Sequence, residues 1–238
     1  MPTFTVERAI ESLTYEYNLL ALIYMIFMLA VWWTCRIWQT PEFVDKRKIF
    51  FSPRWTIYLQ NKFRSKFLDK FTSFFWFWVF TFAIVGMWVI CLFQGPNAWR
   101  IGVAVLGAVS TSITIQLLFP VIVPIRYPDF KRPMEGFEAV RLENFGTSDK
   151  VNGLLYNGLP SNHMGMILTG AWICLYVNNY DPWIGWQLGV ILFLILAAIF
   201  AFSVIYLGEH YLQDMVASFI VYPVALTTFE IISRIIVP

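Results

Sequence analysis

Charged residues are scarce in this chain of 238 residues: they make up 13% of it, whereas 58% of the residues are hydrophobic and 19% are aromatic. This composition lies far outside that of soluble domains and is typical of proteins that cross a membrane several times. Cysteine is also scarce, with three residues, none of them in a CxxC motif. A disulfide framework and a zinc site are therefore not expected.

The chain also lacks the sequence features of several other classes. Its first residues show neither a basic start nor a small-residue cleavage site, so the first apolar run is expected to stay in the mature protein. Internal repeats, low-complexity tracts and Gly/Ser linkers are absent as well. We therefore predict a single membrane domain over residues 1–238.

Long hydrophobic runs are what the chain has in abundance. Crossing ~30 Å of hydrocarbon takes about 20 apolar residues. Six stretches approach this length, at 17–37, 71–94, 100–122, 161–179, 184–207 and 211–233. Turn-forming residues at 95–97 and 178–182 predict antiparallel hairpins of the second with the third span and of the fourth with the fifth. The expected fold is an all-α integral membrane bundle of six transmembrane helices.

Most of the charge falls in two longer connections, 38–70 and 123–160, which two intervening spans place on the same side of the membrane. Residues 36–70 contain nine Lys or Arg against three acids, which orients this side toward the cytoplasm and both termini outside. Between residues 49 and 71 the basic residues alternate with aromatic residues and leucine. This pattern predicts one or two interfacial helices in the headgroup layer, with a solvated loop as the alternative.

The chain has only two histidines, and both stand at the ends of hydrophobic spans. His163 follows Ser161, a helix-capping residue at the start of the fourth span, where free backbone N–H groups favour a phosphate. His210 and Asp214 are four residues apart and share a helical face, so the carboxylate can accept one ring N–H and leave the other nitrogen as a nucleophile. An interfacial histidine and a capping aspartate, both hydrated, are the alternative, but ionisable groups inside membranes usually serve function.

A phosphate site also needs positive charge, and the 123–160 connection offers three basic residues. Arginine binds phosphate oxygens through a planar fork of donors and is the better ligand of the two basic types. The same residues can instead act only as determinants of topology, since basic residues often follow a membrane span. The candidates are Arg126, Lys131 and Arg132.

Three motifs occur in a fixed order: Arg132-Pro133, then Pro160-Ser161-Asn162-His163, then the run from Ser203 to Asp214. Together they resemble the signatures of the type 2 phosphatidic acid phosphatase superfamily, K-x6-R-P, P-S-G-H and S-R-x5-H-x3-D, set within six transmembrane helices. The resemblance covers roughly the second half of the chain. Three positions depart from it, with Ile125 in place of the lysine, Asn162 in place of the glycine and Val204 in place of the arginine.

The resemblance implies a role for each matching residue. His210 is expected to attack phosphorus and form a phosphohistidine, Asp214 to orient it, and His163 to protonate the leaving oxygen. The implied substrate is a phospholipid or isoprenoid phosphate or diphosphate in the membrane, with no metal, cofactor or nucleic acid involved. The phosphoryl oxygens are expected to be held by Arg132, Ser161 and the amide of Asn162, with Lys131 and Arg126 as further candidates.

The missing arginine at Val204 leaves alternatives open. Phosphotransferases similar to the inositol phosphorylceramide synthases often lack it, keep an H-Y-x2-D motif like that of His210 to Asp214, and use a lipid alcohol as acceptor. A cation from residues 46–70 can also take its place. The rival from another class is a non-catalytic lipid-binding or transport relative, with polar residues 110–116 lining a pathway or packing helices together.

The CDP-alcohol phosphotransferases need an aspartate cluster of the D-G-x2-A-R kind, and the chain has none. Most relatives in the phosphatase superfamily have their site on the external or luminal face, whereas the charge bias places it on the cytoplasmic face. Of the two, we favour the cytoplasmic face.

Overall fold

The computed structural model describes residues 5–14, 23, 26–27, 30, 51–94, 97–121 and 159–236, and over these residues the chain is all-helical. The predicted helical class is thereby confirmed for this part of the chain. In chain order the helices are α1 (Val6–Thr14), α4 (Arg54–Phe63), α5 (Lys66–Phe74), the π-helix η1 (Phe75–Val79), α6 (Phe80–Leu92), α7 (Ala98–Leu118), α9 (Asn162–Tyr180), α10 (Ile184–Leu207) and α11 (Leu212–Ile236).

Among the described residues, three helices are long and apolar enough to cross a membrane: Ala98–Leu118 in α7, Ile184–Leu207 in α10 and Leu212–Ile235 in α11. They coincide with the predicted spans 100–122, 184–207 and 211–233. The predicted span 161–179 coincides with α9, and 71–94 coincides with a helical run in which α5 continues through η1 into α6. Nearly all of the predicted span 17–37 lies outside the described residues.

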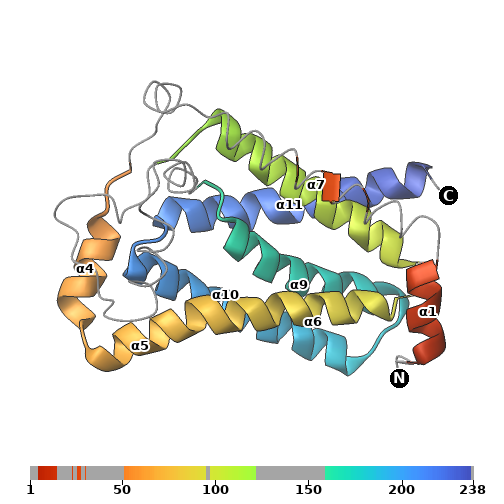
Figure 1. The fold of residues 1–238 in the computed structure, drawn as a ribbon, viewed down its shortest axis with the longest axis horizontal. Coiled ribbons are helices and arrows are strands. Elements are labelled where there is room, and N and C mark those ends of the chain that lie inside the picture. Colours follow the sequence, from red (N-terminus) through yellow and green to blue (C-terminus); the bar gives the residue numbers. More distant parts are fainter. Residues whose placement is uncertain are drawn as a thin grey trace.

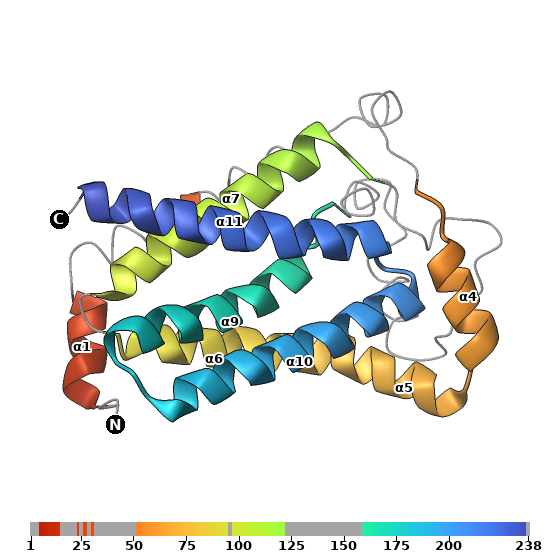
Figure 2. The same ribbon diagram turned by 180° about the vertical axis from the view of Figure 1, so that it is seen from behind.

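The helices form an elongated bundle with α9 at its centre (Figure 1). α9 contacts α6, α7, α10 and α11, and α7 packs along α11. Seen from behind, α7 and α11 lie on one side of α9, and α6 and α10 lie on the other (Figure 2). α4 and α5 are at one end of the bundle, whereas α1 and the C-terminus are at the opposite end.

The two predicted hairpins differ in how closely their helices pack. α9 and α10 are antiparallel and in extensive contact, as the turn residues at 178–182 predicted (Figure 1). α6 and α7 also run antiparallel, but they make few contacts because α7 packs on α11 instead. Glycine permits this pairing, since a Cβ on Gly107 of α7 would lie 2.1 Å from the ring of Phe229 of α11.

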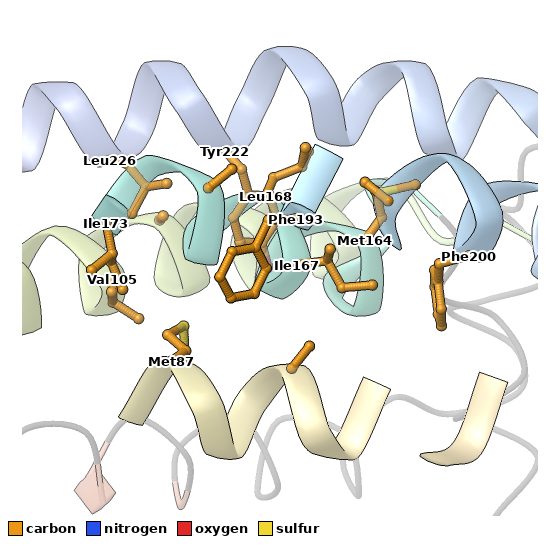
Figure 3. Packing of buried hydrophobic residues seen from close by; sticks show 14 of the residues in the cluster. Met87, Val105, Met164, Ile167, Leu168, Ile173, Phe193, Phe200, Tyr222 and Leu226 are labelled. Atoms are coloured by element: carbon orange, nitrogen blue, oxygen red, sulfur yellow. The ribbon is translucent and has the colours of Figure 1, made fainter. Parts of the chain in front are cut away.

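Buried apolar side chains from η1, α6, α7, α10 and α11 meet those of α9 and form the core of the described residues (Figure 3). Met87 of α6 lies near Val105 of α7 and Ile173 of α9, and Phe193 of α10 lies near Ile167 of α9, all of them buried. The outer face of α10 is equally apolar but exposed at Leu188, Ile191, Leu192, Leu194 and Ile195. Exposed aliphatic faces of this extent are explained by contact with lipid acyl chains.

Candidate functional site

The N-terminal ends of α9 and α11 meet near the C-terminal end of α10, at the end of the bundle where α4 lies (Figure 1). Ser161 is the N-cap of α9, and its hydroxyl accepts a hydrogen bond from the backbone N–H of Met164 at 3.3 Å. Its own N–H donates to the backbone carbonyl of Asp214 at 3.4 Å. The hydroxyl of Ser218 joins the two helix ends further, because it donates to the carbonyls of Ser161 (3.0 Å) and Asp214 (2.7 Å).

His210 and Asp214 form the buried pair that their spacing predicted. The Nδ1 atom of His210 lies 3.2 Å from Oδ2 of Asp214, which also accepts the backbone N–H of Tyr211 at 2.8 Å. Both side chains are buried, with Asp214 at 0% exposure and His210 at 6%. Because the carboxylate is an acceptor, it assigns the ring proton to Nδ1 and leaves a lone pair on Nε2.

The lone pair on Nε2 faces Ser161. The serine Oγ lies 3.1 Å from Nε2 of His210, close enough for its O–H to donate to the ring nitrogen. Asp214, His210 and Ser161 therefore form a continuous hydrogen-bonded line that holds the imidazole in one orientation and one tautomer. The line ends at the start of α9, where the helix dipole favours an anion.

His163 lies beside this line on the first turn of α9. Its ring centroid is 6.0 Å from that of His210, in an edge-on arrangement. The rings of Trp76 and Phe200 each lie 6.2 Å from it, so the imidazole has aromatic neighbours on α10 and η1. His163 at the start of α9 and His210 in the turn before α11 thus converge, as expected from the return of the chain to the same side after α10.

The side chain of Asn162 is directed at α7 and α11. Its Oδ1 accepts hydrogen bonds from the hydroxyls of Ser112 and, at 2.9 Å, Tyr222, while its Nδ2 donates to Oε1 of Gln116 at 3.3 Å. Gln116 in turn donates to the carbonyl of Pro160 at 2.7 Å. This polar clamp fixes the first turn of α9 to α7 and α11.

Ser112 and Gln116 belong to the polar run 110–116 of α7, and their contacts with Asn162 support the helix-packing explanation for these two residues. Tyr222 was not expected, because one tyrosine in an apolar helix carries no local signal. The backbone amide of Asn162 stays the predicted phosphate donor at this position.

The turn between α10 and α11 presents His210 to the site. Gly208 ends α10 in the left-handed conformation (φ 76°), which glycine adopts without steric cost. The carbonyl of Val204 then accepts the N–H groups of Glu209 (2.9 Å) and His210 (3.3 Å). Val204 thus holds the histidine through its backbone.

A family model described as the PAP2 superfamily matches residues 45–228, which is more than half of the chain. The chain belongs to the PAP2 superfamily. No curated protein and no solved structure matches it. Superfamily membership points to a phosphatase- or phosphotransferase-type enzyme acting on lipid phosphates, and together with the three apolar helices it identifies a membrane protein.

The superfamily match extends beyond the motifs to α4 and α5, which begin soon after residue 45. Gln60 of α4 donates to the backbone carbonyl of Tyr206 at 2.8 Å, and the hydroxyl of Tyr206 donates to the carboxylate of Asp69 in α5. The ring of Phe51 lies edge-on to that of Tyr211, with centroids 5.5 Å apart. None of these contacts was predicted, although the basic and aromatic composition of the segment marked it as distinct.

At position 204 this chain has a valine, whereas the superfamily signature has an arginine. The Val204 side chain is completely buried among the apolar residues of the core and offers no donor to a phosphate. The three basic residues predicted to bind phosphate, Arg126, Lys131 and Arg132, lie outside the described residues.

Proposed function

We propose that this PAP2-superfamily protein cleaves or transfers the phosphoryl group of a lipid phosphate or diphosphate through a phosphohistidine on Nε2 of His210. The observation that supports this best is the hydrogen-bonded line from Asp214 through His210 to Ser161. It leaves the reactive lone pair at the start of α9, where a phosphate is favoured.

In the first step the Nε2 lone pair attacks phosphorus and the bond from phosphorus to the lipid oxygen breaks. His163 gives its proton to that oxygen, while Asp214 stabilises the positive charge that develops on the His210 ring. The Ser161 hydroxyl, which faces Nε2 before the reaction, turns its hydrogen to a phosphoryl oxygen. The amide of Asn162 is a second donor to these oxygens.

In the second step a water molecule or an alcohol attacks the phosphohistidine. Its proton passes to His163, and the electron pair of the nitrogen–phosphorus bond returns to Nε2 of His210. Water yields free phosphate, and an alcohol yields a new phosphorylated product. Transfer to a lipid alcohol is the second candidate function, favoured by the valine at position 204.

Positive charge for the phosphoryl oxygens comes, in this proposal, from Arg132, with Lys131 and Arg126 as further ligands. The contact between Phe51 and Tyr211 supports a contribution from the basic segment 46–70 as well, since Tyr211 directly follows the nucleophile. Charge stabilisation of this kind is the main catalytic requirement of phosphoryl transfer, because little covalent chemistry is left to the protein.

We also propose six membrane spans in a single domain, with α4 and α5 lying in the headgroup layer. Substrate tails then enter from the bilayer while the headgroup reaches His163 and His210. The charge bias places this end of the bundle on the cytoplasmic side, opposite to most relatives. Labelling of single cysteines at positions 61 and 179 by a membrane-impermeant reagent tests the orientation, and labelling of position 61 from outside intact cells would contradict it.

The purified protein is to be incubated with a panel of phosphorylated lipids, with and without alcohol acceptors, and assayed for free phosphate and for new lipid. His210→Gln is expected to abolish both products while leaving the protein folded. Gln213→Ala is the matched control, because Gln213 lies in the same turn with an exposed side chain. Full activity of the His210 variant would overturn the mechanism.

The same assay separates the proposal from its rival. No product from the wild-type protein with any lipid of the panel would favour a non-catalytic lipid-binding or transport protein. Activity is expected to survive a chelator, and a strict requirement for Mg²⁺ would contradict the proposed chemistry.

A further inference from the structure

The α4–α5 elbow, residues 54–74, has an unusual charge balance for this chain. It contains five basic residues and a single acid, Asp69. The carboxylate of Asp69 accepts the hydroxyl of Tyr206, so it is directed at α10. The positive charge is therefore not offset on the outer side of the elbow. The basic residues are Arg54, Lys62, Arg64, Lys66 and Lys70.

α4 and α5 each have an inner face toward α10 and an outer face away from it. Thr56, Gln60 and Thr72 are buried on the inner face, which contacts α10. On the outer face, Trp55 is 56% exposed and Phe67 is 75% exposed. Exposed aromatic rings on a helix whose other face packs on the bundle are typical of an element that lies at a membrane surface.

Lys62 is a basic residue of the outer face that contacts aromatic residues of the same face. Its ammonium group donates to the hydroxyl of Tyr58 at 2.8 Å and lies 5.2 Å and 5.4 Å from the ring centroids of Tyr58 and Phe63. The charged group of the lysine thus lies over aromatic rings that are themselves exposed on the outer face. This arrangement fits the boundary between acyl chains and headgroups.

The occupant that fits this surface is a layer of anionic phospholipid headgroups. The elbow is tied to the bilayer, because α5 continues without interruption through η1 into the apolar helix α6. Its net positive charge complements anionic headgroups, and its aromatic residues fit the layer just below them.

The elbow also touches the turn that carries the proposed nucleophile. Gln60 and Asp69 hold the backbone carbonyl and the hydroxyl of Tyr206 in the last turn of α10, four residues before His210. In the same turn the carbonyl of Val204 accepts the N–H of His210. Two hydrogen bonds and one helical turn therefore connect the elbow to the histidine.

We propose that the α4–α5 elbow binds anionic phospholipid headgroups and that this binding, through Tyr206, holds the His210 turn in its active arrangement. The second half of this proposal rests on the proposed function of His210, whereas the first half does not. Anionic lipid in the same leaflet is thereby an activator of the enzyme and not its substrate.

Lipid binding is tested without any enzyme assay. The protein is reconstituted in nanodiscs of phosphatidylcholine with increasing fractions of phosphatidylglycerol, and hydrogen exchange is followed in the peptide 54–74. Protection is expected to rise with phosphatidylglycerol and to fall again in high salt, which screens surface charges. Unchanged exchange at every fraction would overturn the proposal.

Two quadruple variants separate charge from packing. K62Q/R64Q/K66Q/K70Q removes four exposed charges, each of which contributes roughly fivefold to binding at an anionic surface. Four such factors multiply to several hundredfold, so the glutamine variant is expected to stay unprotected at the phosphatidylglycerol fractions that protect the wild type. The control K62R/R64K/K66R/K70R keeps every charge and is expected to behave as the wild type. Equal behaviour of the glutamine variant and the wild type would overturn the proposal.

The coupling is tested with water-soluble dioctanoyl phosphatidic acid as substrate, so that bilayer charge and substrate concentration vary independently. Phosphatidylglycerol is expected to raise kcat in the wild type. Tyr206→Phe removes only the hydroxyl that Asp69 accepts, and is expected to keep the lipid-dependent protection of 54–74 while losing most of the rise in kcat. Protection without any effect on kcat in the wild type would overturn the coupling, whereas absence of activity at every lipid composition would overturn the proposed function and leave the binding result intact.

Discussion

Removing the Asn162 side chain is expected to destabilise the protein and to disorder the start of α9. The side chain has three partners on two other helices: Ser112 and Gln116 in α7, and Tyr222 in α11. Asn162→Ala takes the hydrogen-bond partner away from each of them at once. Because the hydroxyls of Ser112 and Tyr222 are fully buried, water does not readily replace the lost amide.

The expected loss in the free energy of unfolding depends on whether each hydrogen-bond partner of Asn162 finds a new partner. Interhelical hydrogen bonds in membrane proteins average about 0.6 kcal/mol, so three of them amount to about 2 kcal/mol. The upper estimate assigns about 3 kcal/mol to the unpaired Tyr222 hydroxyl and about 1 kcal/mol to Gln116. Ser112 adds little, since its hydroxyl can turn to a carbonyl in its own helix. We expect the free energy of unfolding to fall by about 2–4 kcal/mol.

The loss is measured by unfolding the purified protein with SDS in mixed micelles, with helicity as the signal. Asn179→Ala is the matched control, because Asn179 lies near the other end of α9 with an exposed side chain. Asn162→Gly restores the residue of the family signature. It is expected to be at least as destabilising as Asn162→Ala, because it also leaves the three partners on α7 and α11 without the amide.

Catalysis is expected to decline together with stability. Ser161 and His163 flank Asn162, so a looser first turn of α9 misplaces both, and displacements of about 1 Å can lower rates by about a hundredfold. A change in the free energy of unfolding below about 0.5 kcal/mol, the usual value for an exposed position, would show that the polar clamp does not hold α9 and would refute the reasoning.

Two further predictions address the nucleophile and the core. Asp214→Asn is expected to lower kcat by about 10³–10⁴-fold with the fold retained, because an amide can donate to Nδ1 of His210 and favour the wrong tautomer; near wild-type turnover in the lipid phosphate assay would contradict this. Gly165→Ala is expected to lower the thermal midpoint of unfolding, since its Cβ would lie 2.0 Å from the buried ring of Tyr222 and overpacking costs about 1–3 kcal/mol. Gly86→Ala, whose Cβ meets nothing within 4 Å, is the control, and equal midpoints for the two variants would count against the packing described for α9.

Much of the helical framework was predictable because its determinants are local. The apolar run 184–207 coincides with α10, and the run 161–179 differs from α9 by one residue at each end. Turn residues such as Pro182 and Gly208 mark where helices stop. The π-helix η1 carries no comparable signal, because Phe75–Val79 is as apolar and aromatic as its surroundings. It was therefore not expected.

The candidate site was predictable to the extent that it depends on spacing within one helix turn. His210 and Asp214 pair as their separation of four residues requires, and Ser161 caps α9 as its position before an apolar run indicates. The contact between Ser161 and His210 joins residues 49 apart in the chain. It was anticipated only because two spans return the chain to the same side of the membrane and because both residues belong to family signatures.

By itself, the sequence determined the membrane class, the positions of the helices and the identity of the two histidines, because hydrophobic length, turn chemistry and i,i+4 spacing act over short stretches of chain. Only the tertiary structure decided that α7 pairs with α11, that Asn162 turns toward that pair, and that Gln60 and Asp69 hold Tyr206. These choices depend on which side chains meet across helices far apart in the chain. Steric fit and hydrogen-bond geometry settle them, and neither can be read from one stretch of sequence.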